Sequence, residues 1–148
     1  MPALSVISYD NIFMPIRPDY ADIHVDVRES FRWPEIFARK VKVGKEVALY
    51  AFRSVPLPNV DTAILAAFDE KALLAAKGAE GFIHYEPVPH LSYCLWDSTE
   101  LARRATSATA HREAAAYAVQ AYSDWQLLCW EAVQPTAGSP VEFTPVAR

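Results

Sequence analysis

The spacing of hydrophobic positions changes along the chain, and each change predicts a separate element. Residues 46–55 (EVALYAFRSV) are apolar at nearly every position and are followed by two prolines, a pattern typical of a strand buried on both faces. A helix of about 15 residues is expected next, capped by Asn59 or Asp61 and ended by Gly78. Its apolar side chains recur at near-helical spacing: Ile64, Leu65, Phe68, Leu73 and Leu74.

Two short apolar runs separated by prolines come after this helix. Residues 81–89 (GFIHYEPVP) and 90–96 (HLSYCLW) predict the two strands of a hairpin. Asp97 and Glu100 then form a capping-box pattern, which predicts a helix that begins at Ser98 or Thr99.

Residues 106–109 (TSAT) interrupt that helix in the sequence pattern. Their hydroxyl groups compete for backbone hydrogen bonds, so we expect a break there and a restart capped by Ser107 or Thr109. The second piece should run to about Tyr122, and residues 124–133 (DWQLLCWEAV) should form the last strand.

The resulting order of elements is strand, helix, strand, strand, helix, strand. It predicts an α+β fold, the ferredoxin-like βαββαβ core, in which two helices cover one face of an antiparallel sheet. Both faces of the predicted strands are apolar, and the helices cover only one. A second copy of the same sheet is the simplest cover for the other face, so a homodimer is expected.

The two ends of the chain lie outside this predicted domain of residues 46–133. In the N-terminal extension, residues 1–45, strand character at 4–16 and a short helix at 30–41 suggest an edge strand and a possible lid. Ser30 lies near the expected start of that helix, and Pro34 fits its first turn. Residues 134–148 contain three prolines and predict an extended arm, either loose or lying on a partner subunit.

Composition and charge narrow the possible functions. The net charge of −4, without a concentrated basic face, argues against nucleic-acid binding. No apolar run approaches the roughly 20 residues of a membrane span and no leader pattern is present, so neither a membrane nor secretion is expected and a cytoplasmic location follows. The four histidines lack metal-ligand spacing and the four glycines form no phosphate loop, so neither a metal nor a nucleotide cofactor is expected.

The two cysteines provide a check on topology. Cys94 and Cys129 lie in the third and fourth predicted strands, which the first strand separates in a ferredoxin-like sheet. Two strand spacings of about 4.8 Å place the cysteines too far apart for a disulfide.

The segments GFIHYE and LSYCLWDSTELARRATSATAHREA carry a resemblance to a known family. Over about 90 residues, 46–133, the chain resembles the dimeric α+β barrel superfamily, which includes antibiotic-biosynthesis monooxygenase-like and stress-responsive barrel proteins. The resemblance implies a homodimer whose sheets meet back to back, with a pocket in each subunit between sheet and helices. Members include cofactor-independent monooxygenases, haem-binding enzymes, cyclases, isomerases and proteins of no known reaction, so the fold alone does not specify the chemistry.

Histidines are the first candidates for chemistry in such a pocket. His111 lies on a helical face with small residues (Ala108, Ala114, Ala115 and Ala118), and an imidazole in a cavity floored by them would be a general base. The alternative is that His111 bonds a carbonyl and packs against a strand. His84 is the second catalytic candidate, with a half-exposed edge strand as its alternative.

The remaining candidates are substrate-binding residues. Trp96 and Tyr93 lie on opposite faces of one strand, so at most one of them lines a given pocket. Trp96 resembles a tryptophan that holds flat substrates in related oxygenases, and its alternative is aromatic packing in the core. Arg53 is a candidate clamp for a carboxylate or phenolate, or else the partner of Asp61 or Glu86 in a salt bridge. Tyr122 is expected at the far end of the face that carries His111.

Three hypotheses for function follow. The first is a protein that binds a small hydrophobic, aromatic or polyketide-like molecule and acts as a cofactor-independent monooxygenase or related acid-base enzyme, with His111 as base. The second is a non-catalytic ligand-binding or stress-response protein. The third, by analogy, is a haem-binding protein with His111 as ligand.

Overall fold

The centre of the protein is an antiparallel sheet with the strand order β2-β3-β1-β4-β5. The structure is a computed structural model and describes residues 11–146. Its strands are β1 (Val47–Pro56), β2 (Phe82–Glu86), β3 (Leu91–Trp96), β4 (Tyr122–Val133) and β5 (Glu142–Pro145). The first four have the ferredoxin-like order, which confirms the predicted α+β class.

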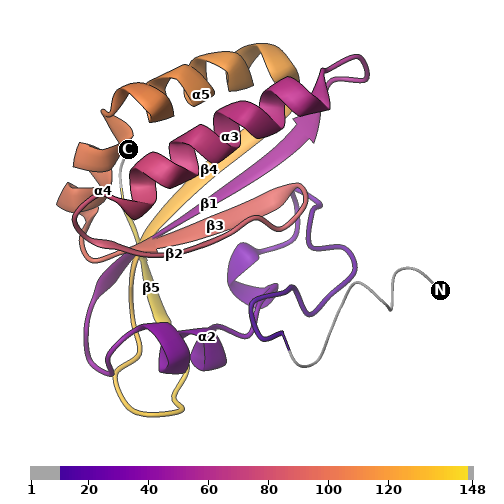
Figure 1. Cartoon of the computed structure of the whole chain (residues 1–148). Coiled ribbons are helices and arrows are strands. Elements are labelled where there is room, and N and C mark those ends of the chain that lie inside the picture. Colours follow the sequence, from indigo (N-terminus) through magenta and orange to yellow (C-terminus); the bar gives the residue numbers. More distant parts are fainter. Residues whose placement is uncertain (1–10, 147–148) are drawn as a thin grey trace.

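Three helices cover one face of this sheet, and Figure 1 shows two of them, α3 and α5, side by side above it. They are α3 (Thr62–Lys77), α4 (Thr99–Thr106) and α5 (Thr109–Ala121). Asp61 caps α3 by accepting from the backbone N–H groups of Ala63 and Ile64, and the helix ends at Gly78 as predicted.

The expected break between α4 and α5 is present and has the expected cause. Ser98 caps α4, and its Oγ accepts from the Leu101 N–H at 3.1 Å. At the other end, the hydroxyls of Thr106 and Ser107 donate to backbone carbonyls of the preceding turn, at 2.9 and 2.7 Å. The restart differs from the prediction, because α5 follows Ala108 and has no side-chain cap.

The hairpin of β2 and β3 contains an irregularity that the sequence pattern did not predict. Simple alternation places Phe82 and His84 on one face, but the register shifts between them. Phe82 packs on Trp96, whereas His84 stacks on Phe13 across the sheet's other face. The bulge therefore reverses the expected relation between these two side chains.

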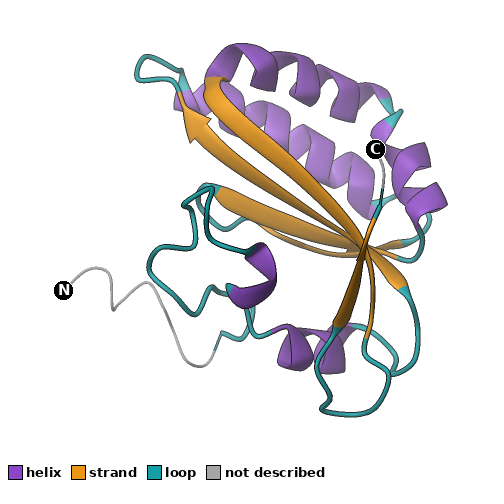
Figure 2. Ribbon diagram, turned by 180° about the vertical axis from the view of Figure 1, so that it is seen from behind, coloured by secondary structure: helices purple, strands orange, loops and turns teal. Residues whose placement is uncertain are grey.

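The face of the sheet opposite the helices is covered by the N-terminal segment of the same chain (Figure 2). This segment, residues 11–41, contains the 3₁₀ turn η1 (Val27–Glu29) and the helix α2 (Trp33–Lys40). Its buried apolar side chains pack on those of the sheet in one core: Val27, Phe31, Trp33, Ile36, Phe37 and Val41 against Leu49, Ala51, Leu91, Tyr93, Leu95, Trp130 and Ala132. The argument that a second copy must cover this face is therefore wrong, and the homodimer stays a prediction without that support.

The prediction for the N-terminal segment is only partly met. The helix at residues 33–40 is confirmed, with Pro34 in its first turn. Of the stretch expected to have strand character, residues 4–10 lie outside the described residues, and residues 11–16 form turns rather than a strand.

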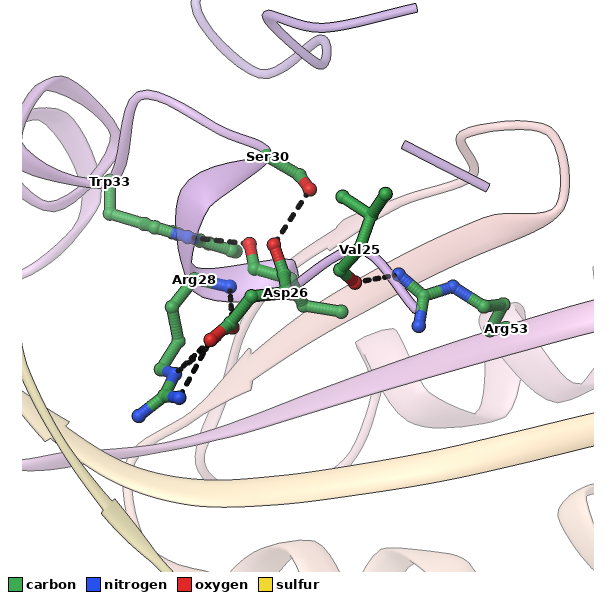
Figure 3. A network of polar contacts seen from close by, with 7 residues as sticks. Val25, Asp26, Arg28, Ser30, Trp33 and Arg53 are labelled. Atoms are coloured by element: carbon green, nitrogen blue, oxygen red, sulfur yellow. Dashed lines mark hydrogen bonds and ion pairs between the residues drawn. The ribbon is translucent and has the colours of Figure 1, made fainter. Parts of the chain in front are cut away.

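Arg53 of β1 fixes the N-terminal segment to the sheet. Its guanidinium is buried and donates to the backbone carbonyls of Tyr20 (3.1 Å) and Val25 (2.9 Å), and to Gln126 Oε1 (2.8 Å). Figure 3 shows the bond to Val25 beside η1, where Asp26 caps the turn. The predicted salt bridge to Asp61 or Glu86 is wrong, because the guanidinium donates its hydrogen bonds to backbone carbonyls and a side-chain amide instead.

The C-terminal tail returns to its own sheet. Residues 142–145 form β5, which pairs with β4 of the same subunit, so this part is not loose. Gln134, at the start of the tail, is buried and donates to the carbonyls of Ser139 and Pro34.

Within residues 11–146, no helix is both long and apolar enough to cross a membrane.

Candidate functional site

A cavity of about 770 Å³ lies between the sheet and the helices α3, α4 and α5. The helices α3 and α5 pack on one another through the stacked rings of Phe68 and Tyr117, at 5.0 Å, and through the ion pair of Lys71 with Glu113. Their inner faces carry mainly alanines (Ala72, Ala75, Ala76, Ala114, Ala115 and Ala118), which are too short to fill the space above the strands. Its volume lies within the usual range for small-molecule sites.

The floor of the cavity is formed by one face of the central strands. Tyr50 of β1 pairs with Cys94 of β3 on one side and with Cys129 of β4 on the other, and all three line the cavity. Both cysteines are free thiols, as the topology argument predicted. Burial raises the pKa of the Cys94 thiol to about 12, so this sulfur is neutral and unreactive at physiological pH.

His111 of α5 lines the cavity, as the sequence suggested. Desolvation by the surrounding protein lowers its pKa below the ordinary value, although the residue as a whole is exposed to solvent. A hydrogen bond to the backbone of Thr106 acts in the opposite direction and is the smaller effect. The bond to the Thr106 backbone belongs to the alternative interpretation, a structural histidine, so the catalytic role of His111 stays a prediction.

Two of the predicted substrate-binding residues also line the cavity. Trp96, at the end of β3, is buried against Ala102 and Phe82, and its Nε1 donates to Cys94 Sγ at 3.3 Å. Tyr122, at the start of β4, lies at the other end, where its ring contacts Phe52 with centroids 5.6 Å apart. The two aromatic side chains therefore lie at opposite ends of the cavity.

Two other candidates are placed on the wrong face of the sheet for this role. Tyr93 borders the cavity, but its ring packs on Phe31 and Trp33 and its hydroxyl donates to the Phe13 carbonyl at 2.9 Å, so it belongs to the core beneath the N-terminal segment. Arg53 is buried on that same side and bound to carbonyls, so it does not clamp a ligand in the cavity.

His84 is likewise outside the cavity. Its ring stacks on Phe13 with centroids 4.5 Å apart, and its Nε2 lies 2.9 Å from Glu86 Oε1. Desolvation lowers its pKa despite the carboxylate of Glu86 beside it. The bulge in β2 turns this histidine toward the N-terminal segment, and we withdraw it as a catalytic candidate.

Two polar residues of the cavity were missed by sequence reasoning. Asp69 of α3 and Tyr85 of β2 both line it. Burial raises the pKa of Asp69, and it raises that of Tyr85 to about 12. A signal for Asp69 was present, because it is the one acid on a helical stripe with Leu65, Ala72 and Ala76. No comparable signal was present for Tyr85, because the bulge in β2 determines on which face of the sheet its side chain lies.

Arg103 of α4 is a further cavity residue that the pattern did not single out. Burial raises the pKa of the Tyr50 phenol, and the positive charge of Arg103 partly offsets that increase.

Within residues 11–146, no group of three or more histidine, cysteine or acidic side chains is arranged to hold a metal ion.

Comparison with known proteins places the chain in a family. Among solved structures, it is similar to SnoaB from Streptomyces nogalater (N63A mutant), a cofactor-independent oxygenase, at 13% identity and a TM-score of 0.45, over 56% of this chain and 90% of SnoaB. This similarity assigns no reaction to the present chain. No curated protein matches. The family model described as PB2B2.08-like matches residues 7–143, and the chain therefore belongs to the PB2B2.08-like family.

Proposed function

We propose that this protein binds a small aromatic or polyketide-like molecule in the cavity and acts on it as a cofactor-independent monooxygenase-like or related acid-base enzyme. The observation that carries the proposal is the position of His111 on the wall of an open cavity of about 770 Å³. A filled core would have favoured a structural histidine.

The chemistry assigned to His111 is removal of a proton from a phenol or an acidic C–H group. Its lowered pKa favours the neutral ring at pH 7, and the unprotonated nitrogen of a neutral imidazole can accept a proton. Arg103 borders the same cavity and would stabilise the negative charge that develops on the substrate. The resulting electron-rich anion is the form of a phenol that dioxygen oxidises most readily.

The roles of Trp96 and Tyr122 in this proposal are to hold a flat ring. Trp96 is 5% exposed and is fixed by its contacts with Phe82 and Ala102, so it loses little side-chain freedom when a ligand binds beside it. A stacked or edge-to-face pair of aromatic rings contributes about 0.5–1.5 kcal/mol of binding free energy beyond that of the surface area it buries.

The test compares ligand binding with turnover. A panel of one- to three-ring phenols is titrated into the protein by calorimetry, and oxygen uptake is followed for the ligands that bind. We expect His111→Gln to retain binding within about threefold and to lose oxygen uptake by about 10²-fold or more. Binding without oxygen uptake in the unaltered protein would instead support the second hypothesis, a non-catalytic ligand-binding protein.

A further inference from the structure

The polar groups of the cavity are separated by charge type. His111 and Arg103 lie where α4 meets α5, and both are basic. The acidic Asp69 is on α3, farther toward Tyr122. The cavity therefore has a basic end and an acidic end, which suggests a ligand with two different polar groups.

The separation of the two ends follows from the helix packing. Phe68 lies opposite Tyr117 and Lys71 opposite Glu113, so α3 and α5 are antiparallel. Asp69 is therefore level with residues 115–116 of α5, four to five residues beyond His111. At a rise of 1.5 Å per residue this offset is about 6–7 Å along the helix axes.

Asp69 lacks a counter-ion among residues 11–146. It makes no hydrogen bond or ion pair there, and its charge interacts with the phenols of Tyr85 and Tyr122. Burial against the cavity wall raises the pKa of Asp69, although the residue as a whole is exposed to solvent, and the described residues supply no cation to offset this effect. A cationic group of a ligand would supply that compensation.

The neighbours of Asp69 are suited to a donor-rich group. Burial raises the pKa of Tyr85 and of Tyr122, and side-chain hydrogen bonding with Ser92 and Ser54, respectively, acts in the opposite direction. The acidic end thus offers the carboxylate and phenol oxygens as acceptors. A protonated amine has up to three N–H donors, whereas a hydroxyl has one.

Aromatic rings complete the acidic end. Phe52 contacts Tyr122, with centroids 5.6 Å apart, and Trp125, at 6.1 Å, and all three residues line the cavity. The faces of such rings attract cations, by about 0.5–2 kcal/mol for each favourable contact. A carboxylate among aromatic rings is the combination that recognises an organic ammonium group.

We propose that the acidic end of the cavity, formed by Asp69, Tyr85 and Tyr122, binds the protonated amine of the ligand. This inference rests on the proposed function, because it assigns a group of the same ligand. The substrate class is then an aromatic amine-bearing molecule whose phenol or acidic C–H reaches His111, about 6–7 Å along the helix axes from its amine.

A matched pair of probes tests the amine directly. Tyramine and tyrosol share the phenol and the two-carbon arm and differ in carrying an amine or an alcohol at its end. Calorimetry at pH 7.5 should show tyramine binding roughly tenfold more tightly than tyrosol. In Asp69→Asn the preference should fall to about onefold, whereas Glu70→Gln, a neighbour on α3 that does not line the cavity, should retain it.

Three results of these titrations would contradict either the inference or the proposed function. Equal binding of tyramine and tyrosol to the unaltered protein overturns the inference and leaves the cavity as a binding site for phenols. A preference for tyramine that survives in Asp69→Asn also overturns it, because the amine is then recognised elsewhere. Absence of binding for both probes and for the wider phenol panel contradicts the proposed function itself.

Discussion

Arg53 on β1 donates from Nη2 to the backbone carbonyl of Val25 at 2.9 Å, and this contact joins the sheet to the N-terminal segment. The same guanidinium also reaches the carbonyl of Tyr20 and the side chain of Gln126. A residue that the sequence suggested as a ligand clamp is thus part of the structural support on the far side of the cavity floor.

Removal of this guanidinium should destabilise the fold. In Arg53→Ala, the carbonyls of Tyr20 and Val25 would lose a charged donor in a buried setting, which costs about 1–3 kcal/mol for each group. We expect the free energy of unfolding, measured in urea, to fall by about 3–4 kcal/mol. Arg39→Ala, at an exposed site on α2, should change it by less than about 0.5 kcal/mol. A similar small change in both variants would show that the network contributes little.

The N-terminal segment should behave as core rather than as a detachable lid. Trp33 is 2% exposed, contacts Phe31 and Tyr93, and donates from Nε1 to the Val27 carbonyl. Trp33→Ala should cost about 3–5 kcal/mol of unfolding free energy. Trp125→Ala removes an equally large ring that is 47% exposed and should cost much less. Equal losses would contradict the packing described for this segment.

Gly81 should tolerate no side chain. Its φ of 89° lies in the left-handed region, and a Cβ there would be 2.6 Å from Leu101 Cδ1. Gly81→Ala should destabilise by about 2–4 kcal/mol, from the unfavourable φ and the clash with α4 together. Gly78→Ala is the matched control, since its φ is ordinary and its nearest neighbour is at 3.7 Å. Thermal unfolding of both variants measures the difference, and identical melting temperatures would contradict it.

The lowered pKa of His111 fixes the expected pH dependence of turnover. Because the free base is the active form, kcat/KM should decrease as the pH falls through the lowered pKa, with a midpoint below 6.5. The histidine signals in NMR spectra, assigned with His111→Gln, give the pKa independently. A midpoint above pH 6.5 would show that another group is the base.

His84 should make stability depend on pH in the same region. Its pKa in the folded protein lies below that of the unfolded chain, so the unfolded chain binds more protons in mild acid. The contribution is complete above about pH 6.5 and is lost as the pH falls through the folded-state pKa. His84→Gln should reduce this loss of unfolding free energy, whereas His24→Gln, at an exposed site, should not.

Local signals in the sequence were sufficient for the ferredoxin-like core. The helix α3 begins after Asp61 and ends at Gly78, as predicted. The break between α4 and α5 lies at Thr106 and Ser107, whose hydroxyl groups compete for backbone hydrogen bonds as expected. The position of His111 on a face of small residues likewise anticipated the cavity.

Long-range packing explains what the sequence did not reveal. Residues 11–41 have no regular period, and their place on the sheet depends on contacts such as Tyr93 with Phe13 that join positions 80 residues apart. Without that segment, both faces of the strands are equally apolar, and neither Tyr93 nor Arg53 can be assigned to one. His84 was misplaced because a bulge interrupts the alternation of β2.

The central claim is that the space beneath α5 holds a ligand, and a pair of alanine substitutions tests it most directly. Ala118 lines the cavity, and Ala116 on the same helix does not. Calorimetric titration with a phenol that binds the unaltered protein should show at least about tenfold weaker binding in Ala118→Trp, because the indole fills the site, and unchanged binding in Ala116→Trp. Equal affinity in both variants would mean that the ligand binds elsewhere and that the cavity is not the functional site.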